Sequence, residues 1–152
     1  MEHNSIEQEI NDKGLTAPRV TLADVEANIS SEHYFTAYEG NFGHQYVRTI
    51  HENGGVVDYE AAKVPPSELK LLTFCVLVLR NGFTVTGESA CASPANFDAE
   101  IGRKIARQKA VEKVWPLLGY ELRSKLNADE MHFSDCAVHN EPYMPNGECD
   151  CK

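Results

Sequence analysis

The sequence predicts an α+β domain in which a helix, three antiparallel strands and a second helix follow one another. Residues 71–80 and 83–90 are apolar and have strand character. Asn81 and Gly82 between them are typical of a hairpin, because both central positions of a type I′ turn need positive φ. Residues 93–126 then carry apolar side chains at helical spacing. We expect both helices to pack on one face of the sheet.

The size and composition of the chain suit one domain with polar tails. It has 152 residues, of which 42% are hydrophobic, and a formal net charge of -9. The chain contains no run of 18 apolar residues, so we expect no transmembrane helix. Its acidic start also lacks the apolar core of a signal peptide. We therefore expect a cytoplasmic protein with no membrane partner, whose five cysteines are thiols or metal ligands rather than disulfides.

The domain is predicted to begin near residue 20, after a polar arm at residues 1–19 that we expect to be disordered. Thr21 and Asp24 have capping-box spacing, with Asp24 in place of the usual Glu or Gln, and an apolar stripe follows them. These features predict a short helix. The aromatic and β-branched side chains between His33 and Tyr38 then favour a strand.

Residues 40–68 have the composition of an insertion. Asn-Gly-Gly and Pro-Pro sequences punctuate this segment, and its few apolar residues would allow a small turn or hairpin. We expect the insertion to interrupt a domain that otherwise extends from residue 20 to residue 126.

The long helix is predicted to start at Ser93-Pro94, a capping hydroxyl followed by a proline at the first helical position. Pro116 is expected to kink or interrupt it. Residues 94–126 hold seven basic and four acidic side chains, whereas the chain as a whole is acidic. The face formed by Arg103, Lys104 and Arg107 is therefore the candidate site for an anion or nucleic acid. The alternative is a solvated helix face with no ligand.

The tail at residues 127–152 has a candidate metal site. Zn²⁺ prefers four thiolate and imidazole ligands in structural sites, and such a site would supply folding energy to a segment with few apolar residues. The alternative is a disordered acidic tail with free thiols. The predicted zinc ligands are Cys136, His139, Cys149 and Cys151, with His132 as a spare.

Catalytic chemistry is weakly represented in the sequence. Cys75 lies in a strand and is expected to be a small buried hydrophobe. Cys91 follows the hairpin, and a nucleophile there would need a basic partner that the sequence does not indicate. We therefore predict no catalytic residues and expect that the protein is not an enzyme.

One long segment resembles a known family. The run TFCVLVLRNGFTVTGESACASPANFDAEIGRKIA, continued by VWPLLGYEL, is similar to small tailed-phage and prophage proteins catalogued as the gene-product-49/gene-product-66 family. The likeness covers residues 20–37 and 71–126 and implies a phage-encoded protein, with no activity to carry over. A weaker topological similarity links residues 102–111 to the basic start of the last helix in double-stranded RNA-binding domains.

These observations predict a phage or prophage accessory protein in the host cytoplasm. We expect it to act by binding a host or defence component rather than by catalysis. The alternative is a nucleic-acid or nucleotide-binding module that uses the basic face of the long helix. The sequence leaves the partner and the oligomeric state open.

Overall fold

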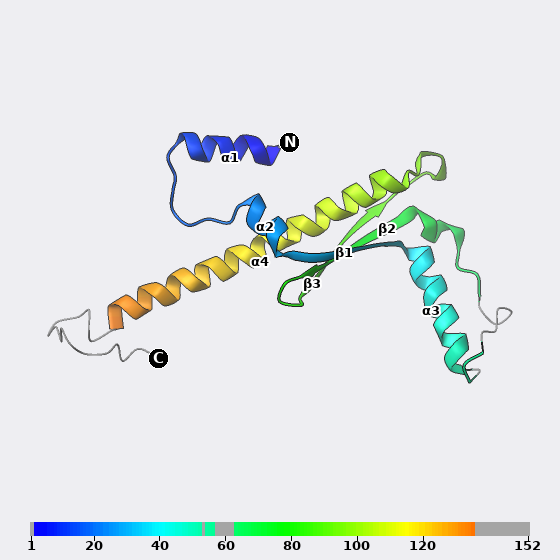
Figure 1. Ribbon diagram of the computed structural model, residues 1–152. Coiled ribbons are helices and arrows are strands. Elements are labelled where there is room, and N and C mark those ends of the chain that lie inside the picture. Colours follow the sequence, from blue (N-terminus) through cyan, green and yellow to red (C-terminus); the bar gives the residue numbers. More distant parts are fainter. Residues whose placement is uncertain (1, 53, 57–62, 136–152) are drawn as a thin grey trace. The chain divides into compact units, whose positions relative to one another are not determined.

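The computed structural model describes residues 2–52, 54–56 and 63–135 (Figure 1). The chain divides into two compact units. Residues 23–114 hold the sheet and everything that surrounds the candidate site. Residues 1–22 and 115–152 form the second unit.

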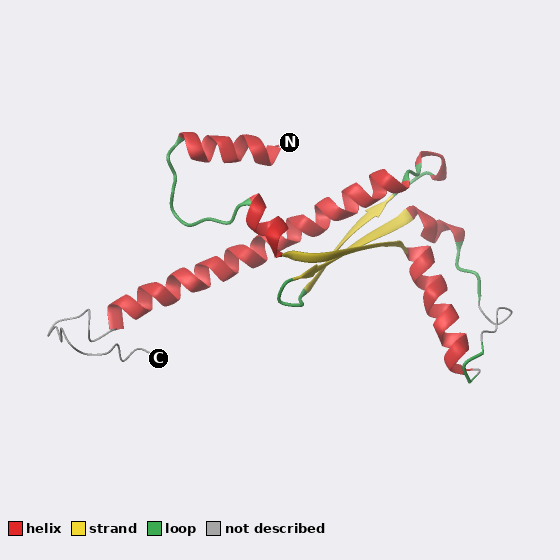
Figure 2. Ribbon diagram, viewed as in Figure 1, coloured by secondary structure: helices red, strands yellow, loops and turns green. Residues whose placement is uncertain are grey.

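Three strands form the sheet, coloured yellow in Figure 2. They are β1 (Ile29–Thr36), β2 (Leu72–Leu79) and β3 (Thr84–Ala90), and both strand pairs are antiparallel in the order β1-β2-β3. The predicted α+β class with a three-stranded antiparallel sheet is therefore confirmed. The strand expected at residues 33–38 begins earlier and ends before Ala37.

The hairpin between β2 and β3 has a different turn from the one predicted. The amide of Gly82 donates to the carbonyl of Leu79 at 2.9 Å, and the amide of Leu79 donates to the carbonyl of Phe83 at 2.8 Å. Gly82 has a φ of 83°, whereas Asn81 does not have positive φ. The loop is thus the three-residue type, in which one glycine in the left-handed region closes the turn. The side chain of Asn81 accepts the amide of Phe83 at 3.0 Å.

Four α-helices and two short 3-10 helices complete the described part of the chain. The α-helices are α1 (Glu2–Asp12), α2 (Leu22–Asn28), α3 (Ala37–Glu52) and α4 (Ala99–Asp135), and the 3-10 helices are η1 (Ser67–Leu71) and η2 (Pro94–Asn96). The short helix expected after residue 20 is present as α2. Helix α1 lies within the arm at residues 1–19, and Glu9 pairs with Lys13 one turn later.

The segment predicted as an insertion begins inside a helix. Thr36 and Glu39 form a capping box at the start of α3: the Thr36 amide donates to the Glu39 carboxylate at 2.7 Å, and the Glu39 amide donates to the Thr36 hydroxyl at 3.2 Å. Residues 40–52 are therefore helical, whereas their composition also allowed a small turn or hairpin. The sequence did not predict this helix because Gly40 and Gly43 lower its intrinsic stability.

The long helix starts later and ends later than predicted. Pro94–Asn96 form η2, and the Ser93 side chain makes no capping bond. Asp98 caps α4 instead, because its carboxylate accepts the amides of Glu100 and Ile101 at 2.9 Å each. Pro116 lies inside the helix without ending it, so residues 127–135, assigned to the tail, are helical.

The core lies between α4 and one face of the sheet. Along β2 the side chains alternate, and Cys75, Leu77 and Leu79 are buried with Thr73 on one face. Ala106, Ala110 and Val114 of α4 are fully buried. Burial also raises the pKa of the Cys75 thiol, which agrees with its predicted role as a small core residue. Small side chains on the helix allow its backbone to approach the strands closely.

The position of the α4 cap leads to a first testable prediction. Replacing Asp98 with alanine should lower the free energy of unfolding by about 1 kcal/mol, because two helix amides lose their acceptor. Ser93→Ala is the matched control at the cap expected from the sequence, and it should change stability by less than about 0.5 kcal/mol. Urea denaturation followed by circular dichroism measures both. A larger loss for Ser93→Ala would contradict the assignment of the cap.

Candidate functional site

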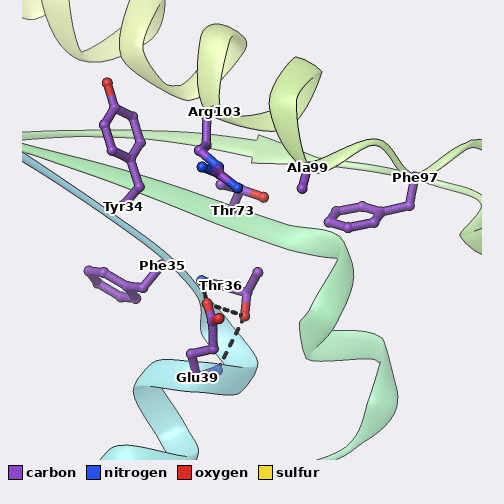
Figure 3. Close-up of a pocket in the computed structure, with 8 residues that line it drawn as sticks. All are labelled: Tyr34, Phe35, Thr36, Glu39, Thr73, Phe97, Ala99 and Arg103. Atoms are coloured by element: carbon purple, nitrogen blue, oxygen red, sulfur yellow. Dashed lines mark hydrogen bonds between the residues drawn. The ribbon is translucent and has the colours of Figure 1, made fainter.

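The candidate site is a pocket of about 370 Å³ between β1, the start of α3 and the start of α4. Figure 3 shows three aromatic rings on its walls and two charged side chains that approach it from opposite elements. Its volume and its mixture of aromatic walls with a few polar groups are typical of ligand sites. The lining residues are Tyr34, Phe35, Thr36, Glu39, Thr73, Phe97, Ala99 and Arg103.

Of the three basic residues predicted as a site, only Arg103 lines this pocket. Its guanidinium hangs from α4 between Tyr34 and Phe97 (Figure 3). Within the described residues it makes no hydrogen bond and no ion pair. Helix α4 begins at Ala99, so Arg103 lies about one turn into the helix rather than in its middle.

Lys104 and Arg107 are held by acidic side chains. The ammonium of Lys104 lies 2.6 Å from the carboxylate of Glu100, one helical turn earlier. Arg107 forms a clamp with Glu26 of α2 and Glu32 of β1, at N–O distances of 2.7 Å and 2.8 Å. The predicted basic face is therefore largely neutralised, and the structure separates Arg103 from its two neighbours.

The Arg107 clamp joins three elements of the fold. The guanidinium donates to both oxygens of Glu26 and to both oxygens of Glu32, and the Tyr34 hydroxyl donates to Glu32. These hydrogen bonds raise the pKa of Arg107, and the Arg107 bonds lower the pKa of Glu32. The clamp fixes the hydroxyl end of Tyr34, so its ring is held in place as a wall of the pocket.

Glu39 supplies the negative charge of the pocket. One of its oxygens, Oε2, accepts both the amide and the hydroxyl of Thr36, at 2.7 Å and 3.0 Å. These two bonds, and to a lesser degree the nearby charge of Arg103, lower the pKa of Glu39. The carboxylate is therefore ionised at neutral pH. In the described part of the chain its other oxygen, Oε1, accepts no hydrogen bond.

Thr73 has a polar group without a partner at the floor of the pocket. The side chain is only 3% exposed, and its hydroxyl oxygen makes no hydrogen bond to any of the described residues. A β-carbon at Gly102 would lie 3.0 Å from that oxygen, so the glycine makes room for the hydroxyl beneath α4. Thr73 also lines a neighbouring cavity of about 130 Å³, which is bounded in part by Cys91 and Asn96.

The remaining chemical candidates have different outcomes. The thiol of Cys91 donates to the carbonyl of Ser93 at 3.1 Å. Cys136, His139, Cys149 and Cys151 lie outside the described residues, and His132 falls where only the helix backbone is described, so zinc binding stays a prediction. Among the residues that are described, no cluster of three His, Cys, Asp or Glu side chains could hold a metal ion. In the same residues, no helix is long and apolar enough to cross a membrane.

Sequence reasoning missed most of the pocket. Tyr34, Phe35 and Thr36 were expected in a strand without a site, and Glu39 was assigned to no function. The T-x-x-E spacing of Thr36 and Glu39 is the signal that predicts the start of α3, and hence one wall of the pocket. Nothing local in the sequence brings Thr73 and Arg103 together.

A comparison with protein-family models decides the relationship of the chain to known proteins. The model of the phage protein (N4 Gp49/phage Sf6 gene 66) family matches residues 20–126. The chain belongs to this phage protein family. The predicted resemblance is thereby confirmed. The part of this phage protein that matches the family contains the whole sheet, the Arg107 clamp and every residue of the pocket. No curated protein and no solved structure matches the chain.

Proposed function

We propose that this phage-family protein acts by binding a protein of the host cell or of its defences, not by catalysis, and that the Arg103 pocket is the contact site. The observation that carries the proposal is the combination of an unpaired Arg103 with the rings of Tyr34, Phe35 and Phe97. Arginine and aromatic side chains dominate the binding energy of protein interfaces. Tyr34 and Phe35 are 36% and 38% exposed, so a partner would reach them.

The charge distribution favours a protein partner over a nucleic acid. Duplex RNA or DNA is bound through several cations that neutralise successive phosphates. Here Lys104 and Arg107 already pair with acidic side chains, which leaves Arg103 as the one unpaired cation of the predicted basic face among the residues described. The formal net charge of -9 also opposes the approach of a polyanion.

The proposal is tested with two charge reversals one residue apart. Arg103→Glu removes the cation of the pocket, whereas Lys104→Glu makes the same change in a surface pair whose side chains are more than two-thirds exposed. In a pull-down from host-cell extract, the wild type should retain one host protein in stoichiometric amount. In calorimetry, the purified partner should then bind Arg103→Glu at least about tenfold more weakly than it binds the wild type. Lys104→Glu should stay within about threefold of wild type.

Two results would overturn the proposal. One is a partner whose affinity falls equally in both variants, because the pocket would then have no special role. The other is tight binding of duplex RNA or DNA that weakens steeply with salt and is lost in Lys104→Glu. That second result would establish the nucleic-acid alternative. Circular dichroism of both variants confirms that each is folded.

A further inference from the structure

We propose that the pocket receives an acidic side chain of the partner, an aspartate or a glutamate, and that Arg103 and Thr73 are its hydrogen-bond donors. This inference rests on the proposed function and names the chemistry that the site recognises. It follows from three features of the pocket: a buried hydroxyl with no partner, an unpaired guanidinium, and a carboxylate with one free oxygen.

The first feature is the Thr73 hydroxyl. A buried hydroxyl that makes no hydrogen bond lowers stability, so such groups are rare unless they serve a purpose. Thr73 is in the central strand β2, where valine would fill the same volume without a polar atom. Thr73 lines both the main pocket and the smaller cavity, and its hydroxyl oxygen lies close to Gly102 of α4. A ligand that reaches the floor of the pocket would satisfy this hydroxyl.

The second feature is the Arg103 guanidinium. A planar guanidinium binds a carboxylate through two parallel hydrogen bonds, which is the geometry that Arg107 displays twice on the same helix. Arg103 lies one turn before Arg107 and has no carboxylate within 4.0 Å among the described residues. Its unused donors therefore match the carboxylate of a partner.

The third feature is Glu39, which selects against a more highly charged ligand. Arg103 and Glu39 together give the pocket no net charge. A bound carboxylate would therefore leave the pocket with one negative charge, whereas a phosphate group would leave nearly two, so Glu39 repels a phosphate more strongly than a carboxylate. The free oxygen of Glu39, Oε1, is an acceptor for a backbone amide of the same bound segment. A peptide supplies both groups, and the rings of Phe35 and Phe97 would cover its apolar part.

In the experiment, the full chain is titrated with three soluble probes, and binding is monitored through the NMR chemical shifts of its backbone amides. The probes are the capped tripeptides Ac-Phe-Glu-Phe-NH₂ and Ac-Phe-Gln-Phe-NH₂, and adenosine monophosphate. The glutamate peptide should bind with saturable shifts around Thr73 and Arg103, and the glutamine peptide at least about fivefold more weakly. Equal affinities for the two peptides, or tighter binding of adenosine monophosphate, would overturn the inference.

The variant Thr73→Val separates a binding role from a structural one. It removes a hydroxyl that has no partner in the free protein, so it should raise the denaturation midpoint or leave it unchanged. It should nevertheless weaken binding of the glutamate peptide by about fivefold, the value of one hydrogen bond. Lower stability together with unchanged peptide affinity would show that the hydroxyl serves the fold alone.

The two proposals fail in distinguishable ways. A host partner whose binding depends on Arg103, combined with peptides that bind equally well, leaves the proposed function standing and removes the acidic side chain. If the protein discriminates between the two peptides but no protein partner depends on Arg103, the inference about the acidic side chain stands and the proposed function fails. The pocket would then recognise carboxylates, but not as part of a host protein.

Discussion

Replacing Gly87 with alanine is expected to destabilise the sheet domain by about 3 kcal/mol or more, enough to unfold a marginally stable domain. Gly87 is in the centre of β3, directly beneath α4. A β-carbon there would overlap the backbone carbonyl of Ala106 and the backbone nitrogen of Ala110. These atoms belong to a helix backbone and cannot move aside as a flexible side chain could, so the helix would have to lift from the sheet.

Gly43→Ala is the control for Gly87→Ala. Gly43 lies inside α3, and a β-carbon there would have no atom within 4 Å outside its own helix turn among the described residues. Alanine favours a helix over glycine, so this variant should gain about 0.5–1 kcal/mol. Urea denaturation measures both variants. Near-native stability of Gly87→Ala would mean that α4 does not lie as close to β3 as the structure describes.

Replacing Arg107 with alanine is the second large effect, with an expected loss of about 2 kcal/mol. The substitution removes a guanidinium that is hydrogen-bonded to two carboxylates, and it leaves Glu26 and Glu32 facing each other without a cation. Lys104→Ala is the matched control, because it breaks a pair on the same helix whose side chains are mostly exposed. It should change stability by less than about 0.5 kcal/mol.

The Arg107 clamp also predicts how stability depends on pH. Folding lowers the pKa of Glu32 below its ordinary value of 4.5. The folded protein therefore binds that proton more weakly than the unfolded chain does. The contribution of the clamp is complete above the unfolded pKa and is lost as the pH falls through the folded pKa. The difference in stability between wild type and Arg107→Ala should thus be constant near neutrality and shrink below about pH 4.5.

Denaturation midpoints at neutral pH and in acid, measured for wild type, Arg107→Ala and Lys104→Ala, test this dependence. A difference between wild type and Arg107→Ala that stays constant down to about pH 3 would contradict a role for Glu32 ionisation. If Lys104→Ala loses as much stability as Arg107→Ala, the loss depends on the position on the helix rather than on the clamp.

Much of the fold could be predicted because its signals are local. The apolar run of β2, the Asn-Gly sequence after it and the helical spacing beyond Ala99 each specify their own element. The boundaries were less certain. The sequence predicts a cap at Ser93-Pro94, and only the backbone path shows that Asp98 accepts the helix amides instead. The turn type depended similarly on one residue of loop length, which the Asn-Gly sequence does not determine.

The candidate site was predicted only at Arg103, because its other walls come from distant parts of the chain. Glu39 and Arg103 belong to different helices, and Thr73 is in the strand between them in sequence. The basic composition of residues 94–126 predicts a site at Arg103, Lys104 and Arg107 as a group. Their local surroundings gave no reason to separate them.

The sequence by itself determined the α+β class, the order of the elements in residues 20–126 and membership of the phage protein family. These properties depend on hydrophobic periodicity, turn residues and recognisable sequence motifs, all of which are local features of the chain. Only the tertiary structure decided which charges are available. Arg107 meets carboxylates 75 and 81 residues away, while Arg103, one turn earlier, meets none within 4.0 Å in the described part of the chain. Ion pairing depends on distance in space, and a sequence pattern does not contain that distance.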